Sequence, residues 1–137
     1  AFVAKGYQII SGGTDNHLVL IDTSSFGITG RQAESALLES GIVTNRNSVP
    51  NDPNGAWYTT GVRIGTPALT SRGFGADEFD AVADMIVTVL TNTEATPTAA
   101  GGPGKARYTL ADGVADRVKA AAAELLDANP LYPGLEV

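Results

Sequence analysis

The spacing of apolar residues along the chain predicts three amphipathic helices. The first begins after Thr29, which forms the pattern of a capping box with Gln32, and Gly41 ends it. The second covers residues 77–90, with acidic residues in its first turn, and the third covers residues 109–127. Each helix presents one apolar face to a core, built from Ala33, Ala36, Leu37, Phe79, Val82, Ile86, Val114, Val118 and Leu125.

Short runs of β-branched and aliphatic residues predict strands between these helices. Residues 7–10 and 18–21 are expected to pair antiparallel around a Ser-Gly-Gly turn. Ile42-Val43 is expected to begin another strand, and residues 61–65 form one that carries Arg63 between two aliphatic neighbours. Antiparallel strands beside amphipathic helices predict a two-layer α+β domain.

Residues 44–59 follow neither a helical nor an alternating pattern and are rich in asparagine and proline. Loops of this length are uncommon in compact domains and are usually functional or disordered. Val49, Trp57 and Tyr58 argue against disorder, because such side chains usually pack on something. We therefore expect an ordered, functional loop.

Residues 94–105, rich in threonine, alanine, proline and glycine, predict a flexible linker. The linker ends in Gly-Gly-Pro-Gly-Lys, which invites comparison with a phosphate-binding loop. That loop requires glycine where this chain has Ala99, and serine or threonine where it has Ala106. A linker is therefore the preferred interpretation.

The domain is expected to span residues 7–137. Residues 1–6 have the pattern of the end of a preceding helix, which Gly6 stops. Because the chain also begins at Ala1, we expect it to be a piece of a longer polypeptide.

Composition narrows the classes of partner. The net charge is −6 over 137 residues, which argues against nucleic acid and anionic membranes because both attract basic surfaces. No apolar run approaches the ~20 residues of a membrane span. The chain has no cysteine, so disulfides and thiolate zinc sites are excluded. These features suit a cytoplasmic protein.

The titratable residues outside the loop have structural explanations. His17, the single histidine, is a possible general base, but the turn residues Thr14-Asp15-Asn16 beside it favour a structural role. The acidic residues at 77–84 suit the first turns of a helix, where they complement its dipole, so we expect no metal site.

Arg63 allows two interpretations. Alternation along a strand would point its side chain to solvent. Alternatively, its planar fork of donors binds a carboxylate in bidentate fashion. The neighbouring polar loop favours the second interpretation, since its amides would lie beside the cation.

Three motifs carry a resemblance to a known family. GGTDNHL at residues 12–18, NRNSVPNDP at 45–53 and RIGTPALTSRGF at 63–74 occur in the order and spacing of serine hydroxymethyltransferase. The resemblance runs from Lys5 to Leu90, and the chain resembles the C-terminal domain of that enzyme.

This resemblance implies a fold and an activity. The fold would be the C-terminal (small) domain of a type I transferase that depends on pyridoxal 5′-phosphate. The full-length enzyme would be a homodimer or a dimer of dimers, and would interconvert serine and glycine using tetrahydrofolate as co-substrate. The partners of this chain would then be the remainder of the enzyme, its homodimer mate, the amino acid and the folate.

The resemblance also implies roles for individual residues. Arg63 matches the arginine that binds the substrate carboxylate, and Asn47 matches the asparagine that hydrogen-bonds the pterin of folate. Gly55, Ala56 and Trp57 align with a second folate-contacting segment. The family commonly has Ser-Pro-Phe there, so the resemblance implies contacts through the backbone and the aromatic face, but not through the side chains at 55 and 56. Arg72 matches another arginine near the site and is expected, with His17, to support it.

Other groups of that active site are expected to lie elsewhere. Lys5, Lys105 and Lys119 fall outside any motif that resembles the family's cofactor-binding lysine segment. The resemblance implies that pyridoxal phosphate binds an N-terminal portion, so this chain alone is expected to be inactive. Two alternatives stay open: a folate- or amino-acid-binding module, and a structural fragment without a ligand.

Overall fold

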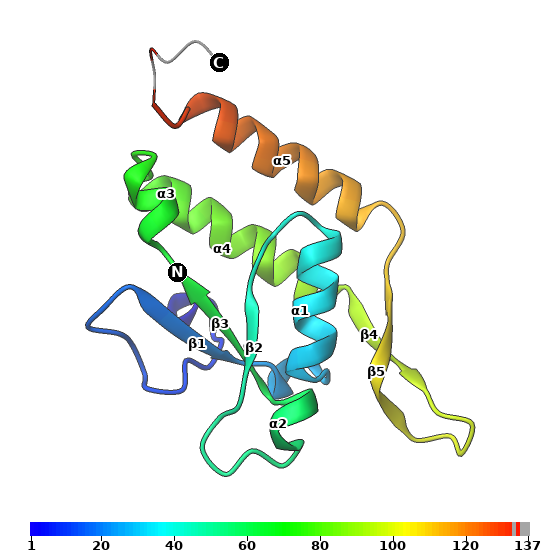
Figure 1. The fold of residues 1–137 in the computed structure, drawn as a ribbon. Coiled ribbons are helices and arrows are strands. Elements are labelled where there is room, and N and C mark those ends of the chain that lie inside the picture. The colour runs from blue at the N-terminus through cyan, green and yellow to red at the C-terminus, as the bar shows by residue number, and fades with distance from the viewer. Residues whose placement is uncertain (133, 135–137) are drawn as a thin grey trace.

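A three-stranded antiparallel sheet lies at the centre of the computed structural model, which describes residues 1–132 and 134 (Figure 1). The sheet has the order β1-β3-β2, with β1 at Leu18–Asp22, β3 at Gly61–Gly65 and β2 at Asn45–Asn47. The strand predicted at 61–65 is therefore confirmed. It occupies the middle of the sheet, although it follows the other two strands in sequence.

The helices pack on the sheet and on each other. Two short 3₁₀ helices and five α-helices occur among the described residues: η1 Val3–Lys5, η2 Ser24–Phe26, α1 Gly30–Glu39, α2 Gly55–Tyr58, α3 Pro67–Ser71, α4 Ala76–Thr91 and α5 Val114–Ala128. In Figure 1, α5 lies along α4, on the side away from the sheet. The predicted α+β class, a small antiparallel sheet with helices packed on it, is confirmed.

The core forms on one face of the sheet. Ile21 of β1 and Val62 of β3 are fully buried there and meet the apolar faces of α1, α4 and α5. Strand alternation places Arg63, next to Val62, on the opposite face, where its side chain is exposed. The sheet thus separates a packed face from a face that carries polar side chains.

The first predicted helix forms as expected, with a reciprocal capping box between Thr29 and Gln32. At its other end, Gly41 takes a φ of 83°. The Ile42 N–H donates to the Leu37 carbonyl at 2.8 Å, and the Gly41 N–H donates to the Leu38 carbonyl at 3.0 Å, as in a Schellman motif. The strand predicted at Ile42-Val43 is wrong, because the backbone of Ile42 completes this helix end.

The linker predicted at residues 94–105 is also wrong. It is part of a β-hairpin formed by β4, Thr93–Pro97, and β5, Pro103–Leu110 (Figure 1). Thr109 and Leu110 belong to β5, so α5 starts at Val114 rather than at residue 109. The hairpin is fixed by contacts with α1, which no local pattern in the sequence reveals.

Two further segments differ in part from expectation. Residues 7–10 contribute one antiparallel bridge, between Ile9 and Ile21, rather than a full strand, and the main partner of β1 is β3. Residues 44–59, expected to be a loop without helical or strand pattern, contain β2 and the short helix α2.

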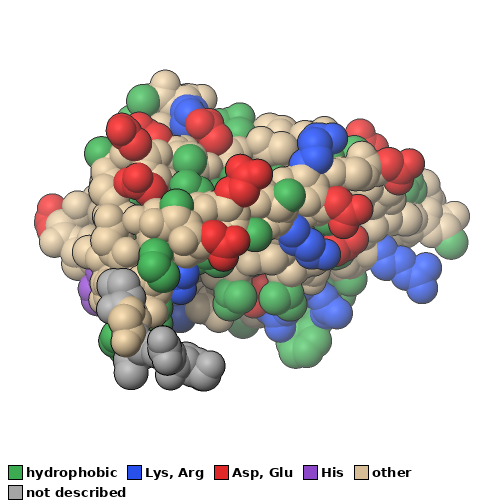
Figure 2. Space-filling view, turned by 90° about the horizontal axis from the view of Figure 1, so that it is seen from above, with side chains coloured by type: hydrophobic (Ala, Val, Ile, Leu, Met, Phe, Trp, Pro, Cys, Tyr) green, Lys and Arg blue, Asp and Glu red, His purple; other side chains and the backbone are tan. Residues whose placement is uncertain are grey.

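The outer surface of the helices carries scattered acidic side chains. Figure 2 looks down on this side and shows them with basic side chains between them. Asp77, Asp80 and Asp84 of α4 are exposed, and Asp84 pairs with Lys5. No helix among the described residues is long and apolar enough to cross a membrane.

Candidate functional site

The polar face of the sheet contains a hollow of about 570 Å³. Its floor is formed by side chains of β1, β2 and β3, and its rim by the loop at residues 11–16. Arg63 and Asn47, which are sixteen positions apart, both line it. The hollow therefore joins the two site residues for which the sequence predicts separate ligand contacts.

Arg63 reaches the hollow because β3 lies between the other two strands. Its backbone pairs with Leu20 of β1 and Asn45 of β2, which fixes its position from both sides. Its side chain is exposed, and no hydrogen bond or ion pair from its guanidinium occurs within residues 1–132. Its five N–H donors are therefore available to a ligand.

Asn47 lies at the end of β2, opposite Gly61, and is half-buried. Gly61 allows the close approach of the strands: a Cβ there would lie 2.7 Å from the Asn47 carbonyl oxygen. The Asn47 side-chain amide donates one hydrogen bond to the Ser48 carbonyl, at 2.8 Å. Its second amide hydrogen and its side-chain oxygen stay available for a ligand.

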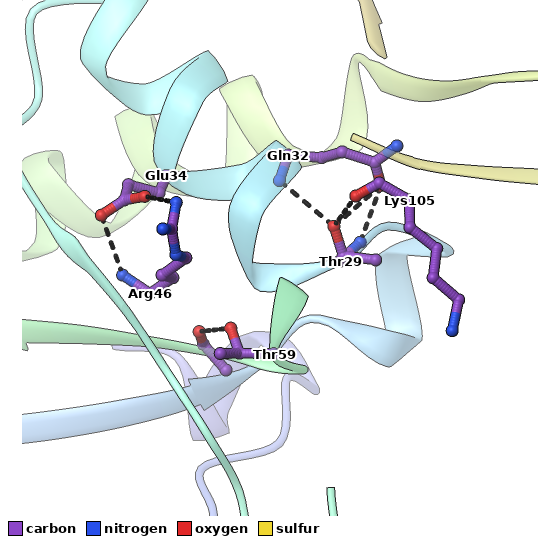
Figure 3. Close-up of polar contacts among 7 residues, drawn as sticks. Thr29, Gln32, Glu34, Arg46, Thr59 and Lys105 are labelled. Carbon is purple, nitrogen blue, oxygen red and sulfur yellow. Dashed lines mark hydrogen bonds and ion pairs between the residues drawn. The ribbon is translucent and has the colours of Figure 1, made fainter. Parts of the chain in front are cut away.

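Arg46, the neighbour of Asn47, points to the other face of the sheet. Its guanidinium pairs with Glu34 of α1 at 3.0 Å, as Figure 3 shows. Its Cζ also lies 5.1 Å from the centre of the Trp57 ring, and the Cζ of Arg31 lies 5.3 Å from that centre. These cation–π contacts hold α2 against α1 and β2.

Gly55, Ala56 and Trp57 form the exposed surface of α2. The Trp57 side chain is 62% exposed, despite the two arginines beside it. None of the three residues lines the hollow. They lie instead in the loop that connects Asn47 to Arg63, so the shape of that loop sets their position relative to the hollow.

His17 is exposed at the base of the rim loop and does not line the hollow. Only its backbone has a clear structural role, since its carbonyl accepts a hydrogen bond from the Thr66 N–H at 3.1 Å. The turn before it is held by Asn16, whose side-chain oxygen accepts from the Leu18 N–H at 2.8 Å. Asp15, in the same turn, lines the hollow and faces ligands entering it.

Arg72 lies away from the hollow, directly after α3. Its guanidinium donates to the carbonyls of Asn129, at 2.9 Å, and Leu126, at 2.7 Å. These carbonyls belong to the C-terminal end of α5, where a cation is favoured by the helix dipole. The geometry shows Arg72 fastening α5 to α3.

Asp52 is a polar residue that the sequence analysis missed. Its carboxylate accepts hydrogen bonds from the N–H groups of Val49, Asn54 and Thr60 and from the Thr60 hydroxyl. Partial burial by itself raises the pKa of this carboxyl, but the hydrogen bonds from Thr60, Asn54 and Val49 outweigh it, and the pKa is lowered. The sequence feature that could have indicated this structural role is the position of Asp52 among the turn residues Pro50, Pro53 and Asn54-Gly55. In such turns an Asp side chain commonly accepts hydrogen bonds from nearby backbone amides.

The lysines of the chain do not fit a pyridoxal phosphate site in this hollow. Lys5 pairs with Asp84, the Lys105 amine lies 6.0 Å from the centre of the Tyr58 ring, and Lys119 is exposed on α5 beside Gly41. None of them lines the hollow. The described residues also contain no group of three or more His, Cys, Asp or Glu side chains placed to hold a metal ion.

Comparison with known proteins gives one consistent family. A family model described as serine hydroxymethyltransferase matches residues 1–86. A serine hydroxymethyltransferase of Mycolicibacterium smegmatis is 68% identical over 134 residues, which are 98% of this chain and 26% of that protein. Those of Cutibacterium acnes and Salinispora tropica are 63% and 58% identical, each over 97% of this chain. The chain spans 26% to 28% of the length of these three relatives.

Proposed function

This chain belongs to the serine hydroxymethyltransferase family, and from that premise we propose that it is the ligand-contacting C-terminal domain of such an enzyme. The full-length protein would transfer the hydroxymethyl group of serine to tetrahydrofolate and release glycine. This domain would supply the arginine that binds the amino-acid carboxylate and part of the folate site. Pyridoxal phosphate would bind another part of the polypeptide, and a second subunit would pair with it as a homodimer.

One observation carries the proposal: Arg63 and Asn47 line the same hollow on the polar face of the sheet. Serine and glycine carry a carboxylate, and a pterin presents a hydrogen-bonding edge with donors and acceptors. The hollow offers a guanidinium for the first and an amide for the second. An amino acid and a pterin held here would lie side by side, as transfer of a one-carbon unit between them requires.

The assignment of the carboxylate to Arg63 follows from charge and geometry. A guanidinium without a protein partner attracts an anion, and its fork matches the two oxygens of a carboxylate. Asp15 on the rim disfavours a second anionic group nearby, since like charges repel. The arginine would hold one end of the amino acid and so orient the bond that is to be broken.

The role of Asn47 follows from its unused hydrogen-bonding groups. One amide hydrogen is bound to Ser48, so a pterin would meet the remaining hydrogen and the side-chain oxygen. Gly55, Ala56 and Trp57 would contact the folate beyond the pterin, through the exposed backbone and ring of α2. We propose that Arg72 and His17 support the site indirectly, by fastening α5 and by bonding the rim loop to Thr66.

The proposal is tested by Asn47→Ala in the full-length enzyme. We expect folate-dependent formation of glycine from serine to fall on the order of tenfold, since one or two pterin hydrogen bonds of about 1 kcal/mol each are lost. Cleavage of a 3-hydroxy amino acid without folate is expected to change little. Equal losses in both reactions would contradict the pterin contact.

Calorimetry on this chain by itself examines the alternative of an independent binding module. We expect tetrahydrofolate to give no measurable heat, because the groups of the remaining polypeptide are absent. Saturable binding would instead favour an independent folate-binding module.

A further inference from the structure

The Asp52 carboxylate makes four of the hydrogen bonds within the loop between Asn47 and Arg63, and the Asn54 side-chain amide adds another by donating to the Thr60 hydroxyl at 3.0 Å. Oδ2 of Asp52 accepts hydrogen bonds from the N–H groups of Val49, at 3.1 Å, and Thr60, at 2.7 Å. Oδ1 accepts from the Asn54 N–H at 2.9 Å and from the Thr60 hydroxyl at 2.6 Å. Asp52 therefore connects the start, the middle and the end of the loop.

The end of this loop has a strained backbone. Thr59 has φ 56° and ψ 170°, a region that β-branched residues rarely adopt and that is normally left to glycine. Such a conformation persists only where neighbouring groups over-determine it. Figure 3 shows Thr59 close to α1, and its carbonyl accepts a hydrogen bond from the Gly30 N–H at 3.0 Å.

Thr60, the next residue, is fixed from two sides. Its carbonyl accepts hydrogen bonds from the N–H and the hydroxyl of Thr23, at 2.8 and 2.9 Å. Its N–H and hydroxyl both donate to Asp52. The hydrogen bonds from Thr23 and Gly30 thus hold Thr59 and Thr60 to the rest of the domain. Asp52, which is bonded to Thr60, connects the earlier part of the loop to this fixed position.

We propose that Asp52 is a positioning residue for folate. It holds residues 48–60 in one conformation and thereby sets α2, with Trp57, relative to Asn47. The inference rests on the proposed function, and it adds a determinant of folate affinity that lies outside the hollow. Asp52 itself does not line the hollow, so it acts through the loop rather than on the substrate.

Asp52 is suited to this role because it is an acceptor only. Four donors converge on its two oxygens, which keeps the carboxyl charged and the loop closed around it. When Asp52 is removed, the hydrogen bonds from Gly30 and Thr23 still hold Thr59 and Thr60. The N–H groups of Val49 and Asn54, however, lose the carboxylate that joins them to Thr60, and this part of the loop becomes an ensemble of shapes. Folate would then have to order the loop on binding, which lowers its affinity.

Removing Asp52 is expected to lower the affinity for folate much more than the affinity for serine. Arg63 is paired with β1 and β2 through its backbone and does not depend on the loop for its position. Asn47, in contrast, directly precedes the loop, and α2 lies within it. A general loss of folding would affect serine and folate alike, whereas a loss of loop order would mainly affect folate.

The test uses Asp52→Ala and Asp52→Asn in the full-length enzyme. For Asp52→Ala, we expect the KM for tetrahydrofolate to rise about tenfold or more, with the KM for serine changed less than about twofold. Asp52→Asn keeps one acceptor oxygen and is expected to lie between the wild type and the alanine variant. Thr60→Val removes the hydroxyl that donates to Asp52 and accepts from the Asn54 side-chain amide. Because the three backbone N–H donors to Asp52 remain in place, it is expected to give a smaller rise in the same KM.

Glu78→Ala is the matched control. Glu78 also accepts a backbone hydrogen bond, from the Gly75 N–H at 2.8 Å, but it lies at the start of α4 and outside the loop. We expect both KM values to stay at the wild-type level. A similar rise in folate KM for Glu78→Ala would overturn the inference, because it would show a general response to lost stability.

Asn47→Ala, measured in the same series, separates the two proposals. If Asn47→Ala raises the folate KM while folded Asp52→Asn and Thr60→Val leave it unchanged, the inference about Asp52 is wrong and the proposed function stands. If none of these variants affects folate kinetics, the folate assignment itself is wrong. Equal increases in serine and folate KM for Asp52→Asn would also overturn the positioning role.

Discussion

Replacing Arg63 with alanine tests the part of the proposed site that binds the amino acid. Arg63 is held in the middle of the sheet by backbone pairing with Leu20 and Asn45, and alanine retains those hydrogen bonds. Its side chain is exposed and has no protein partner among the described residues. The free energy of unfolding should therefore change by no more than about 0.5 kcal/mol.

The effect on the substrate should be much larger than the effect on the fold. Hydrogen bonds to a charged group contribute about 1.5–3 kcal/mol net, and each 1.4 kcal/mol corresponds to about a factor of ten. Because the guanidinium has no partner to release within residues 1–132, its hydrogen bonds are available to the carboxylate. Arg63→Ala is expected to lower kcat/KM for serine by roughly 10- to 150-fold. Arg63→Lys should recover only part of this loss, since a point charge lacks the fork.

The assay is steady-state kinetics of the full-length enzyme with serine varied and folate saturating, together with thermal unfolding of each variant. Arg117→Ala is a suitable control, because Arg117 is an exposed arginine of α5, outside the hollow. Unchanged serine kinetics in Arg63→Ala, or an equal loss in Arg117→Ala, would refute the assigned role. A large loss of stability in Arg63→Ala would show that the argument from exposure is wrong.

Two further predictions concern stability. The Gln32 side-chain amide donates to the carbonyls of Gly104 and Arg107. Gln32→Leu should therefore lower the free energy of unfolding by about 1–3 kcal/mol and speed amide hydrogen exchange in β5. Unchanged exchange in β5 would show that these two hydrogen bonds do not hold the hairpin. Folding lowers the pKa of the Asp52 carboxyl from its ordinary value of 3.8. The charged carboxylate therefore contributes its full stabilisation to the folded state above pH 3.8, and this contribution is lost as the pH falls through the lower pKa of the folded state. The difference in unfolding free energy between wild type and Asp52→Ala should therefore be constant near neutral pH and shrink below about pH 4, whereas a difference that does not depend on pH would contradict the role of the charge.

The long helices α1 and α4 and their ends, and most of α5 apart from its start, could be predicted from local sequence because their signals are local. The α1 capping box joins Thr29 to Gln32 within one turn, and α4 buries a face whose members recur every three or four residues. The same holds for β3, an alternating strand bounded by glycine. The family is also identifiable from the sequence alone, through three motifs in register, and the comparisons confirm it.

The elements that were predicted incorrectly depend on partners distant in sequence. The hairpin at 93–110 has no strong strand pattern, and it is fixed where Thr29 and Gln32 bond the backbone of β5. The Ile42-Val43 pair has a strand-like composition, but the backbone of Ile42 is used by the end of α1. In the hairpin, tertiary hydrogen bonds outweigh the local preference of the sequence, and at Ile42 a helix-capping hydrogen bond does so.

The candidate site shows the same division. The sequence singles out Arg63 and Asn47 by residue type and by resemblance. Strand alternation by itself leaves open whether Arg63 faces solvent or a ligand, and the neighbouring polar loop favours a ligand. The structure shows an exposed side chain that lines a hollow together with Asn47, so the two alternatives describe the same face. The antiparallel pairing of β2 with β3 brings the two residues to one face, and β1, paired with the other edge of β3, completes the lining of the hollow.

The sequence by itself determined the family, the long helices α1 and α4 and the strand β3, and it singled out Arg63 and Asn47 as candidate ligand-binding residues. The tertiary structure decided that these two residues share a surface, and it showed that Asp52 accepts four hydrogen bonds within the loop between them. The physical reason is the sequence separation of the interacting residues. Helix caps and helical periodicity involve residues a few positions apart. Strand order, the packing of one sheet face and the hydrogen bonds between Asp52 and Thr60 depend on contacts between residues farther apart.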